Sequence, residues 1–469
     1  MSFPMKALHK HRCLLLNRRK MMSAATTPSL TTRAAKKEGS IADIFTSLTG
    51  GEQAALPPRF ADLKKMLWRD EMVDSWKDVL EKLPKAIEEI EAKGSEIVPR
   101  VQYEDLGSNY SRIIQEIKTR GAVIVQGGVP IQKALAWKQS ILDYVALNKN
   151  RVKGFPQDNI QVFEIYNSKA QIEARTHPAI VNTQNFLLSK LWHASDPTSE
   201  INLSNPISYF DRLRIRQPGD AKFTLGPHVD CGSVERWEDP GFRQVVKKIL
   251  EGGSNWREHD SFDASPWLLA KQDMYNKSNA CSIFRPWQGW TSLSYCGPNQ
   301  GTLRVLPILK LATAYMTLRP FFYVNPTNMN DWSVDLESSC FPGSGLGTTQ
   351  ELNEKTHPHL QLGRSMVSIP NVVPGDQVFV GHCDLVHAVE GQHRGKSDSS
   401  VFYIPAVPLT LGNASYLSHQ KANFFKGLSP PDFPGGEGES QFVGRATVNE
   451  TLSNEAKRIL GLEALSAGV

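Results

Sequence analysis

The feature that most constrains the fold is a series of short alternating strands that begins at Ile207 and is interrupted by Pro-Gly-Asp turns. The segment ISYFDRLRIRQPGD alternates apolar and polar residues and stops at such a turn, and KFTLGPHVD follows it. Similar patterns cover residues 281–295, 302–309, 365–373, 377–391 and 399–409. Because no regular helices separate these strands, they predict an antiparallel sandwich or barrel. The count of about eight core strands between residues 207 and 409 predicts a jelly roll of mainly β class, with helices packed outside.

Helical patterns surround this region. Apolar residues recur at three- and four-residue spacing over residues 60–92, 134–148 and 168–193, whereas GAVIVQGGV at 121–129 is typical of a buried strand. Two charged stretches, near 231–280 and 309–365, interrupt the strands and are interpreted as insertions. The predicted organisation is a leader over 1–40, a helical segment over 55–100, a β-rich domain over 100–410 with those insertions, and a C-terminal extension over 411–469 with a last helix near 449–465.

The amino terminus carries most of the positive charge. Residues 1–37 contain nine basic side chains and no acid, so the remainder has 44 basic against 48 acidic residues. A basic leader with serine and threonine and without acids is typical of a mitochondrial transit peptide. The alternatives are a disordered tail, or an upstream extension with true initiation at Met21 or Met22, and the protein would then be cytoplasmic. In either case the net charge of +5 gives no reason to expect a nucleic-acid partner.

The cysteine pattern argues against a disulfide framework, and the lengths of the apolar runs argue against a membrane-spanning protein. The six cysteines form no CxxC pair, which predicts unpaired thiols in a reducing compartment, with Cys231 as a small buried residue. Every apolar run is shorter than a bilayer-spanning helix requires, so no membrane partner is expected. The sequence leaves the oligomeric state open.

Two His-x-Asp triplets point to metal chemistry. They are His228-Val229-Asp230 and His382-Cys383-Asp384, and roughly one such triplet is expected by chance from 12 histidines and 48 acids. On a strand, residues two apart point to the same face, so an imidazole and a carboxylate converge there. Together with one distant histidine they would form a facial triad.

The distant ligand is expected in PGDQVFVGHCDLVHAVEG, which offers His382 and His387. The opposite assignment would make His382-x-Asp384 the pair and would leave only His419 as the third ligand. If His228-x-Asp230 is the pair, it and the distant histidine lie at the two ends of the strand-rich region. The triplet His382-Cys383-Asp384 is therefore interpreted as the chance occurrence.

These motifs, in this order, resemble the phytanoyl-CoA dioxygenase-like proteins over roughly residues 100–410. The resemblance rests on Pro227-His228-x-Asp230, Trp290-Thr291-Ser292, Asn299-x-Gly301-Thr302-Leu303-x-Val305-x-Pro307, Gly375-Asp376 followed by a short strand, His382 and His387, and the strand GAVIVQGGV. The combination RIRQPGDxKFxLGPHxD, QGW and VFYIP is similar to a fungal and bacterial branch known only as a domain of unknown function.

The resemblance implies a double-stranded β-helix (the cupin-like jelly roll) that uses Fe(II), 2-oxoglutarate and O₂. It implies His228, Asp230 and His387 as metal ligands and catalytic residues, with His382 as a neighbouring histidine that packs or forms hydrogen bonds. The chemistry implied is oxidation of a substrate carbon coupled to release of succinate and CO₂.

The anchor for the 2-oxoglutarate carboxylate departs from the family pattern. Relatives place an arginine on the strand after the distal histidine, where this chain has Ser399–Tyr403. Arg216 is the favoured substitute, on a strand face that it shares with Arg212 and Arg214. The other candidates are Arg285, Arg304, Arg394 and Lys396, the hydrogen-bond donors Ser400 and Tyr403, and Trp290, which matches a tryptophan that packs on the co-substrate.

The leading interpretation is an oxygenase with a small-molecule substrate, because the two insertions are placed to cover a small ligand. A hydroxylase of proteins is a second possibility, and it would favour an open or grooved mouth. A cupin-like protein that binds metal without turnover is a third, which the missing arginine favours.

Overall fold

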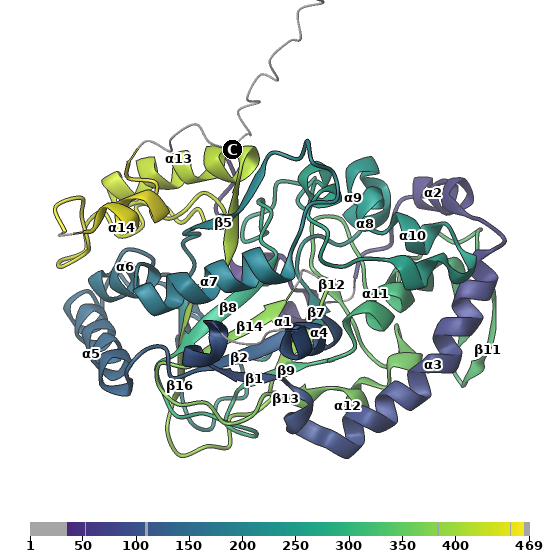
Figure 1. Ribbon diagram of the computed structural model, residues 1–469, viewed down its shortest axis with the longest axis horizontal. Helices are drawn as coiled ribbons and strands as arrows, with labels where there is room; N and C mark the ends of the chain where they lie inside the picture. The colour runs from purple at the N-terminus through teal and green to yellow at the C-terminus, as the bar shows by residue number, and fades with distance from the viewer. Residues whose placement is uncertain (1–34, 52, 108–110, 382–383, 451, 464–469) are drawn as a thin grey trace, which may run out of the picture. The chain divides into compact units, whose positions relative to one another are not determined.

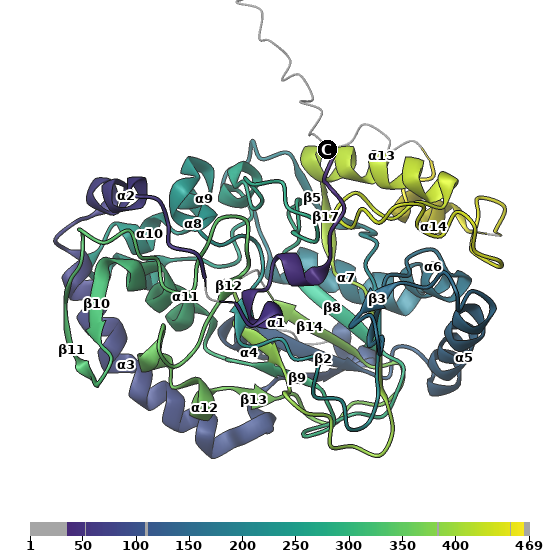
Figure 2. The same ribbon diagram turned by 180° about the vertical axis from the view of Figure 1, so that it is seen from behind.

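Two β-sheets form the centre of the structure, a computed structural model that describes residues 35–51, 53–107, 111–381, 384–450 and 452–463 (Figures 1 and 2). The larger sheet has the strand order β1-β2-β14-β8-β16-β6-β4-β3, and the smaller has the order β12-β7-β15-β9-β13. All pairings in both sheets are antiparallel except β1 with β2.

The strands of the larger sheet are β1 (Arg100–Gln102), β2 (Ala122–Gln126), β3 (Gly154–Phe155), β4 (Val162–Phe163), β6 (Leu213–Arg216), β8 (Trp287–Ser292), β14 (Gln377–Gly381) and β16 (Ser399–Tyr403). Those of the smaller sheet are β7 (His228–Val229), β9 (Leu303–Val305), β12 (Gln350–Glu351), β13 (Val367–Ser368) and β15 (His387–Val389). Two separate pairs are β5 (Ile201–Ile207) with β17 (Val407–Thr410), and β10 (Phe322–Asn325) with β11 (Asn328–Val334).

Along the chain, the strands of the predicted β-rich region are shared between the two sheets. β6, β8, β14 and β16 are neighbours in the larger sheet, and β7, β9, β13 and β15 are neighbours in the smaller one. Apolar residues of both sheets, such as Val229, Val305, Val378 and Val401, belong to one buried cluster. The core therefore lies between the two sheets.

Both predicted Pro-Gly-Asp turns are confirmed. Gly219 and Gly375 have φ angles of 83° and 98°, which favour glycine because it has no Cβ. The carboxylate of Asp376 accepts hydrogen bonds from the Val373 and Gly127 amides, at 2.9 and 3.2 Å. The second turn thereby begins β14 in register with β2.

The helices are α1 (Thr46–Thr49), α2 (Arg59–Leu67), α3 (Met72–Lys93), α4 (Ser111–Arg120), α5 (Ile131–Leu147), α6 (Lys169–Arg175), α7 (Pro178–Leu191), α8 (Glu235–Glu238), α9 (Pro240–Val245), α10 (Lys247–Leu250), α11 (Leu309–Leu318), α12 (Leu362–Ser365), α13 (Leu411–Lys426) and α14 (Asn454–Ile459). α7 crosses the larger sheet in Figure 1. Residues of α5, α6 and α7 pack with Leu213, Ile215 and Phe402, which lie on the outer face of this sheet.

A second group of helices packs around α3. The Trp76 ring of α3 stacks on Phe322 and on Tyr315 of α11, with ring centroids 4.7 and 5.1 Å apart. The insertion predicted near 231–280 contains α8, α9 and α10, and the one near 309–365 contains α11, α12 and β10–β12. The predicted N-terminal helical segment therefore packs against parts of both insertions.

Several sequence expectations need correction. The helix predicted over 60–92 is two helices, because Trp68 adopts an extended conformation after α2. The pattern over 168–193 is also two helices, since Pro178 begins α7 and disfavours helical geometry at the residue before it. α13 was not predicted, and α14 is shorter than the helix expected near 449–465.

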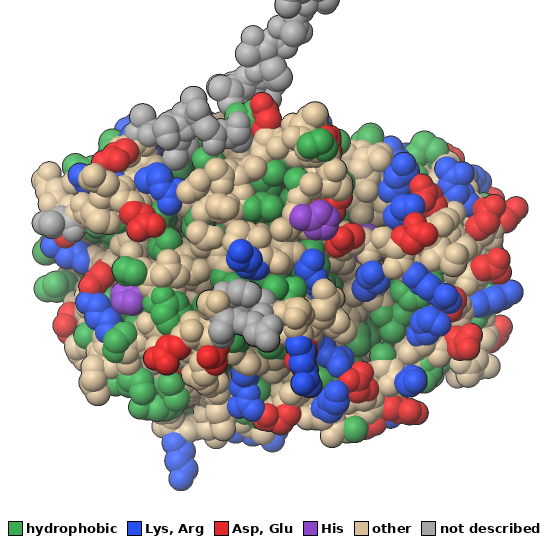
Figure 3. All heavy atoms as spheres, viewed as in Figure 1, with side chains coloured by type: hydrophobic (Ala, Val, Ile, Leu, Met, Phe, Trp, Pro, Cys, Tyr) green, Lys and Arg blue, Asp and Glu red, His purple; other side chains and the backbone are tan. Residues whose placement is uncertain are grey.

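The predicted leader lies mostly outside the described residues. The folded unit starts at Ala35, so residues 35–40 of the expected leader belong to it. Cys231 is disulfide-bonded, which corrects the expectation of six unpaired thiols, whereas Cys281, Cys296 and Cys340 are free. No helix within the described ranges has the length and apolar character to cross a membrane. On the face seen in Figure 3, basic and acidic side chains are interspersed.

Candidate metal centre and cavity

Three of the predicted ligands meet between the two sheets. His228 and His387 are directly opposite each other on β7 and β15, and Asp230 follows β7. The Nε2 atoms of His228 and His387 lie 3.7 and 3.8 Å from the two carboxylate oxygens of Asp230. The candidate ligand atoms of the three residues all lie within 4.8 Å of one another. The register of one strand pair thus creates a cluster that can hold a divalent metal.

Backbone carbonyls orient both imidazole rings. His228 Nδ1 donates to the Gly226 carbonyl at 2.7 Å, and His387 Nδ1 donates to the Leu385 carbonyl at 2.9 Å. Because a carbonyl can only accept, each Nδ1 carries the proton and each Nε2 presents a lone pair to the cluster. Burial, reinforced by His387, lowers the pKa of His228 to about 4, so this ring is neutral near pH 7.

Two arginines contact Asp230, one at its carboxylate and one at its backbone carbonyl. Arg285 Nη2 lies 3.5 Å from Asp230 Oδ2, and Arg236 Nη2 donates to the Asp230 carbonyl at 3.2 Å. Burial opposes ionisation of Asp230, but His387, His228 and Arg285 outweigh it and lower its pKa. Arg236 also forms a buried ion pair with Asp384. The acid of the second triplet therefore acts through Arg236 on the backbone at Asp230, a role that the sequence analysis missed.

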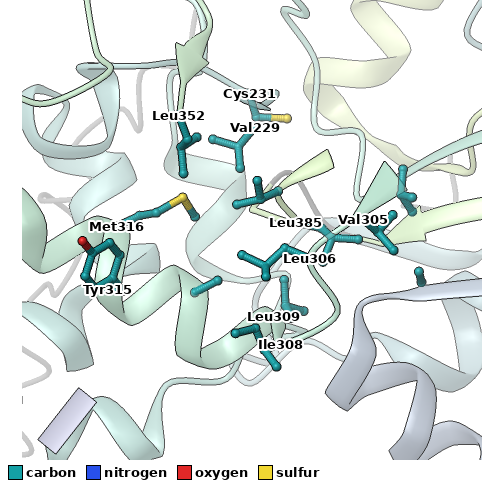
Figure 4. Packing of buried hydrophobic residues seen from close by; sticks show 14 of the residues in the cluster. Val229, Cys231, Val305, Leu306, Ile308, Leu309, Tyr315, Met316, Leu352 and Leu385 are labelled. Carbon is teal, nitrogen blue, oxygen red and sulfur yellow. The ribbon is translucent and has the colours of Figure 1, made fainter. Parts of the chain in front are cut away.

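The chain turns sharply after Asp230 and packs into the core. Cys231 and Gly232 have φ angles of 64° and 87°, and α8 begins shortly afterwards. Figure 4 shows Val229 and Cys231 beside Leu352, with Val305 and Leu385 packed nearby. The ligands are thus fixed by apolar side chains behind them.

A cavity of about 150 Å³ adjoins the ligand cluster. Strands of both sheets line it, through Arg214, Gln288, Trp290, Val401 and Tyr403 on one side and Leu303 and Val389 on the other. The alternation of strand residues explains why Val401 and Tyr403 face the cavity while Ser400 and Phe402 face away. Burial raises the pKa of Tyr403 although Arg214 and Arg212 oppose it, so its hydroxyl stays protonated.

The N-terminal strap, defined here as residues 36–47, contributes to the wall of this cavity. In Figure 2 it is the purple segment that leads into α1. Ile41, Ile44 and Phe45 line the cavity, and the Phe45 ring meets the His228 ring edge-on at 4.8 Å. At one end of the strap, Lys36 Nζ lies 2.9 Å from both Asp273 and Asp432. At the other end, the Thr46 amide and hydroxyl both donate to Glu351 at 2.7 Å.

The predicted co-substrate residues are only partly brought together. Trp290 and Tyr403 line the cavity, as do Arg212 and Arg285. Arg216 does not, because its guanidinium bonds the Asp220 carboxylate and the Glu390 carbonyl, at 2.8 and 2.6 Å. This corrects the expectation that Arg216 is the anchor.

The other residues predicted near the co-substrate or the metal do not line the cavity or lie outside the described residues. Ser400 donates to Asp398 on the outer face of the sheet. Arg394 and Arg304 line a separate surface hollow beside Glu390. His382 lies outside the described residues. Neither Ser400 nor Arg394 can reach a ligand in the cavity from where it lies.

Arg214 lies in the cavity, where Arg216 was predicted to lie. It is 4% exposed and lines the cavity, and its Nη2 donates to Ser399 Oγ at 3.1 Å. Its Nε has no hydrogen-bond partner, and no acid pairs with it among the residues that the structure describes. By contrast, Arg212 and Arg285 both contact Asp211. Arg214 is therefore the cavity arginine whose charge remains uncompensated.

Glu235, Gln272 and Asp273 also line the cavity and were not singled out from the sequence. They come from the insertion predicted near 231–280, where no local periodicity marks an inward face. Burial raises the pKa of Glu235 to about 7, although the Ser233 amide hydrogen bond opposes the effect.

Comparisons with known proteins extend over most of the chain. The Gig2-like family model matches residues 54–462. The uncharacterised protein YbiU of Escherichia coli (strain K12) is 34% identical over 390 residues, which are 80% of this chain and 88% of that protein. The match is to the Gig2-like family rather than to the phytanoyl-CoA dioxygenase-like proteins, which corrects the broader resemblance.

Two solved structures agree with this result. GlcNAc Inducible Gene 2 (GIG2, DUF1479) of Candida albicans is 33% identical with a TM-score of 0.79, over 89% of this chain and 92% of that one. A protein of Salmonella typhimurium LT2, provisionally assigned as an oxidoreductase, is 30% identical with a TM-score of 0.75, over 87% and 99%. The DUF1479 designation agrees with the expected branch of unknown function.

Proposed function

The chain belongs to the Gig2-like family, and we propose that it is an Fe(II)- and 2-oxoglutarate-dependent oxygenase that oxidises a small molecule. The observation that carries the proposal is the convergence of His228, Asp230 and His387 at a cavity that also contains the uncompensated Arg214. A metal site and an anion site in one cavity are what a reaction between iron, a dicarboxylate and a substrate requires.

The strand order supports a double-stranded β-helix. In that fold, eight strands are divided between two facing four-stranded sheets. Here β14-β8-β16-β6 and β13-β9-β15-β7 have the corresponding arrangement, and His228 and His387 lie on β7 and β15. The additional strands extend the edges of this core.

The donor set fits Fe(II). Two imidazoles and one carboxylate on one face suit a non-haem iron and leave further coordination positions open. When bound, iron would supply the activation of O₂ that is coupled to oxidative decarboxylation of 2-oxoglutarate to succinate and CO₂. The Gly226 and Leu385 carbonyls would hold the two rings, and Arg285 and Arg236 would hold Asp230.

Arg214 fits the distal carboxylate of 2-oxoglutarate. A buried guanidinium without an acid is costly, and a bound carboxylate would complete it. The Tyr403 hydroxyl faces the same cavity and can donate a further hydrogen bond, and Trp290 provides an apolar wall. Trp290 and Tyr403 belong to the predicted set, and Arg214 takes the place of Arg216, Arg394 and Ser400 in it.

The N-terminal strap favours a small-molecule substrate over a protein substrate. A protein hydroxylase needs an open mouth for a peptide, whereas here Ile41, Ile44 and Phe45 cover the ligand cluster. The remaining alternative is a protein that binds metal without turnover, and measurement of turnover separates it from the oxygenase.

The test is succinate release by the purified full-length protein with Fe(II), ascorbate and 2-oxoglutarate. We expect the wild type to release succinate and His387→Ala to lose both succinate release and tight metal binding. His419→Ala is the matched control, since His419 is exposed on α13. Metal binding without succinate release under any substrate mixture would favour the binding protein, and absence of metal binding would refute both.

A further inference from the structure

One wall of the cavity contains two side chains with hydrogen-bond acceptor oxygens. Glu235 at the start of α8 and Gln272 both line the cavity, and Gly232 lies between them. A Cβ placed on Gly232 would lie 3.0 Å from the Gln272 carbonyl oxygen and 3.4 Å from Glu235 Oε2. The Gln272 backbone and the Glu235 side chain thus both lie beside Gly232, two positions after the metal ligand Asp230, and both residues line the cavity there.

The charge of Glu235 has no basic partner within the described part of the chain. It is 2% exposed, and its Oε2 accepts a hydrogen bond from the Ser233 amide at 2.8 Å. The nearby acid Asp273 already pairs with Lys36, which also serves Asp432. One ammonium group therefore serves two carboxylates, and no cation is left for Glu235. Burial of such a carboxylate is unfavourable unless a ligand supplies positive charge.

Gln272 provides an independent observation. It is 5% exposed and lines the same cavity, and its Oε1 has no hydrogen-bond partner among the described residues. A buried carbonyl oxygen without a donor costs free energy comparable to a lost hydrogen bond. Glu235 thus lacks a positive charge beside it, and the Gln272 side-chain oxygen lacks a donor, among the described residues.

A protonated amine supplies both, because it carries one positive charge and up to three N–H donors. At pH 8, above the pKa of about 7 of Glu235, an alcohol could donate to Gln272 but would leave the Glu235 carboxylate uncompensated. A carboxylate ligand would add a second negative charge beside Glu235. The chemistry of this wall therefore selects ammonium over both other groups.

We propose that Glu235 and Gln272 bind an ammonium group of the substrate, so that the molecule oxidised in this cavity is a small amine. The inference rests on the proposed function, which places the reaction at the adjacent His228–Asp230–His387 cluster. Glu235 would supply the opposite charge and Gln272 would accept a hydrogen bond, and the two together would fix which carbon of the amine approaches the metal.

The test compares n-butylamine, 1-butanol and butyrate, three probes that share a chain and differ in the terminal group. Each is titrated by calorimetry into full-length protein loaded with Mn(II) and 2-oxoglutarate. We expect butylamine to bind roughly ten- to a hundredfold more tightly than butanol, as for a charge-assisted hydrogen bond, and butyrate to bind most weakly. Glu235→Gln should abolish the preference while Mn(II) and 2-oxoglutarate still bind.

Glu238→Gln is the matched control, because Glu238 lies on the same helix but bonds Arg59 and Tyr275 instead of lining the cavity. The preference should survive in this variant. Equal binding of the amine and the alcohol by the wild type, or no binding of the amine, overturns the amine site. If Mn(II) and 2-oxoglutarate themselves fail to bind, the proposed function fails instead.

Discussion

Arg214 and Arg216 are two residues apart on β6, yet their surroundings differ. The Arg216 guanidinium is completely buried and paired with Asp220, with a further bond to the Glu390 carbonyl. Arg214 has one hydrogen bond, to Ser399, and faces the cavity. Strand alternation gives both residues the same face, so only their distance along the strand separates the paired arginine from the one that lines the cavity.

Replacing each arginine should separate these roles. Arg214→Gln should raise the 2-oxoglutarate KM roughly ten- to a hundredfold, because a charge-assisted bond is lost, and should leave metal affinity unchanged. Arg216→Gln should leave the KM unchanged but lower the free energy of unfolding by about 3–5 kcal/mol, because Asp220 stays buried without its partner. Succinate kinetics and urea unfolding measure the two effects. A large KM effect in Arg216→Gln alone would restore Arg216 as the anchor.

The buried pair of Arg236 and Asp384 should influence the metal from a distance. Asp384→Asn removes the buried acid that Arg236 contacts, which should cost about 3–5 kcal/mol of unfolding free energy. Because Arg236 also holds the Asp230 carbonyl, Mn(II) affinity should fall by roughly ten- to a hundredfold. Calorimetry with Mn(II) measures this. Asp398→Asn, which removes a half-buried pair with Lys138 outside the cavity lining, should leave the affinity unchanged.

The N-terminal strap is an element with little secondary structure that nevertheless completes the site. It is fixed by Lys36 at one end and by Glu351 at the other, and Phe45 packs on a ligand ring between them. A short segment held by a few polar contacts has low local stability compared with the sheets beneath it. Its removal should therefore expose the cluster without dissolving the core.

Truncation tests this idea. A chain that lacks residues 1–47 should lose Mn(II) to a chelator several-fold faster than the full-length protein, because solvent then reaches the His228 side of the cluster. A chain that lacks residues 1–34 is the control and should exchange at the full-length rate, since it keeps Lys36 and Phe45. Stopped-flow measurement of metal release provides the rates. Identical rates for the two truncated chains would show that the strap does not shield the metal.

The elements that the sequence predicted well are those with a local signature. The two Pro-Gly-Asp turns and the buried strand at 121–129 depend on neighbouring residues alone. α13 was missed because Gly412, Asn413 and Ser418 have low helix propensity, and its stability comes from distant contacts such as Gln420 with the Phe210 amide and the Ser208 carbonyl.

In the candidate site, too, residues with a local sequence motif were predicted and residues placed by distant contacts were not. His228, Asp230 and His387 were identified from two short motifs, and the structure brings them together. Ser400 was placed on the wrong face because the inward phase of β16 follows from its pairing with β6 and β8, which the sequence does not display. Glu235 and Gln272 come from an insertion without periodicity, so only the folded chain reveals them.

Taken as a unit, the folded chain carries buried acids that resist ionisation. Glu439 is 1% exposed and accepts hydrogen bonds from the Tyr144 hydroxyl and the Tyr166 amide, at 3.0 and 2.8 Å. Burial raises its pKa from 4.5 to about 7 despite these bonds. The folded chain therefore keeps this proton through a range of pH in which the unfolded chain has released it.

Stability should consequently fall as the pH rises from about 4.5 to about 7, because the unfolded chain ionises first in that window. A pKa shift of this size corresponds to a change of about 3 kcal/mol in the free energy of unfolding from Glu439 alone. Glu439→Gln should flatten this part of the profile and gain stability over the wild type at the alkaline end. Unfolding midpoints measured across the window test the difference. Parallel profiles of the two proteins would contradict the assignment.

The cavity wall combines Ile41 and Phe45 with Tyr403 and Phe433, residues from near the two ends of the described chain. During translation the strap leaves the ribosome first, whereas the last wall residue leaves almost four hundred residues later. A nascent chain can therefore expose His228 and Asp230 but cannot yet enclose them. Enclosure of the candidate metal centre is tied in this way to completed synthesis, and a stalled chain would present His228 and Asp230 without the walls that cover them.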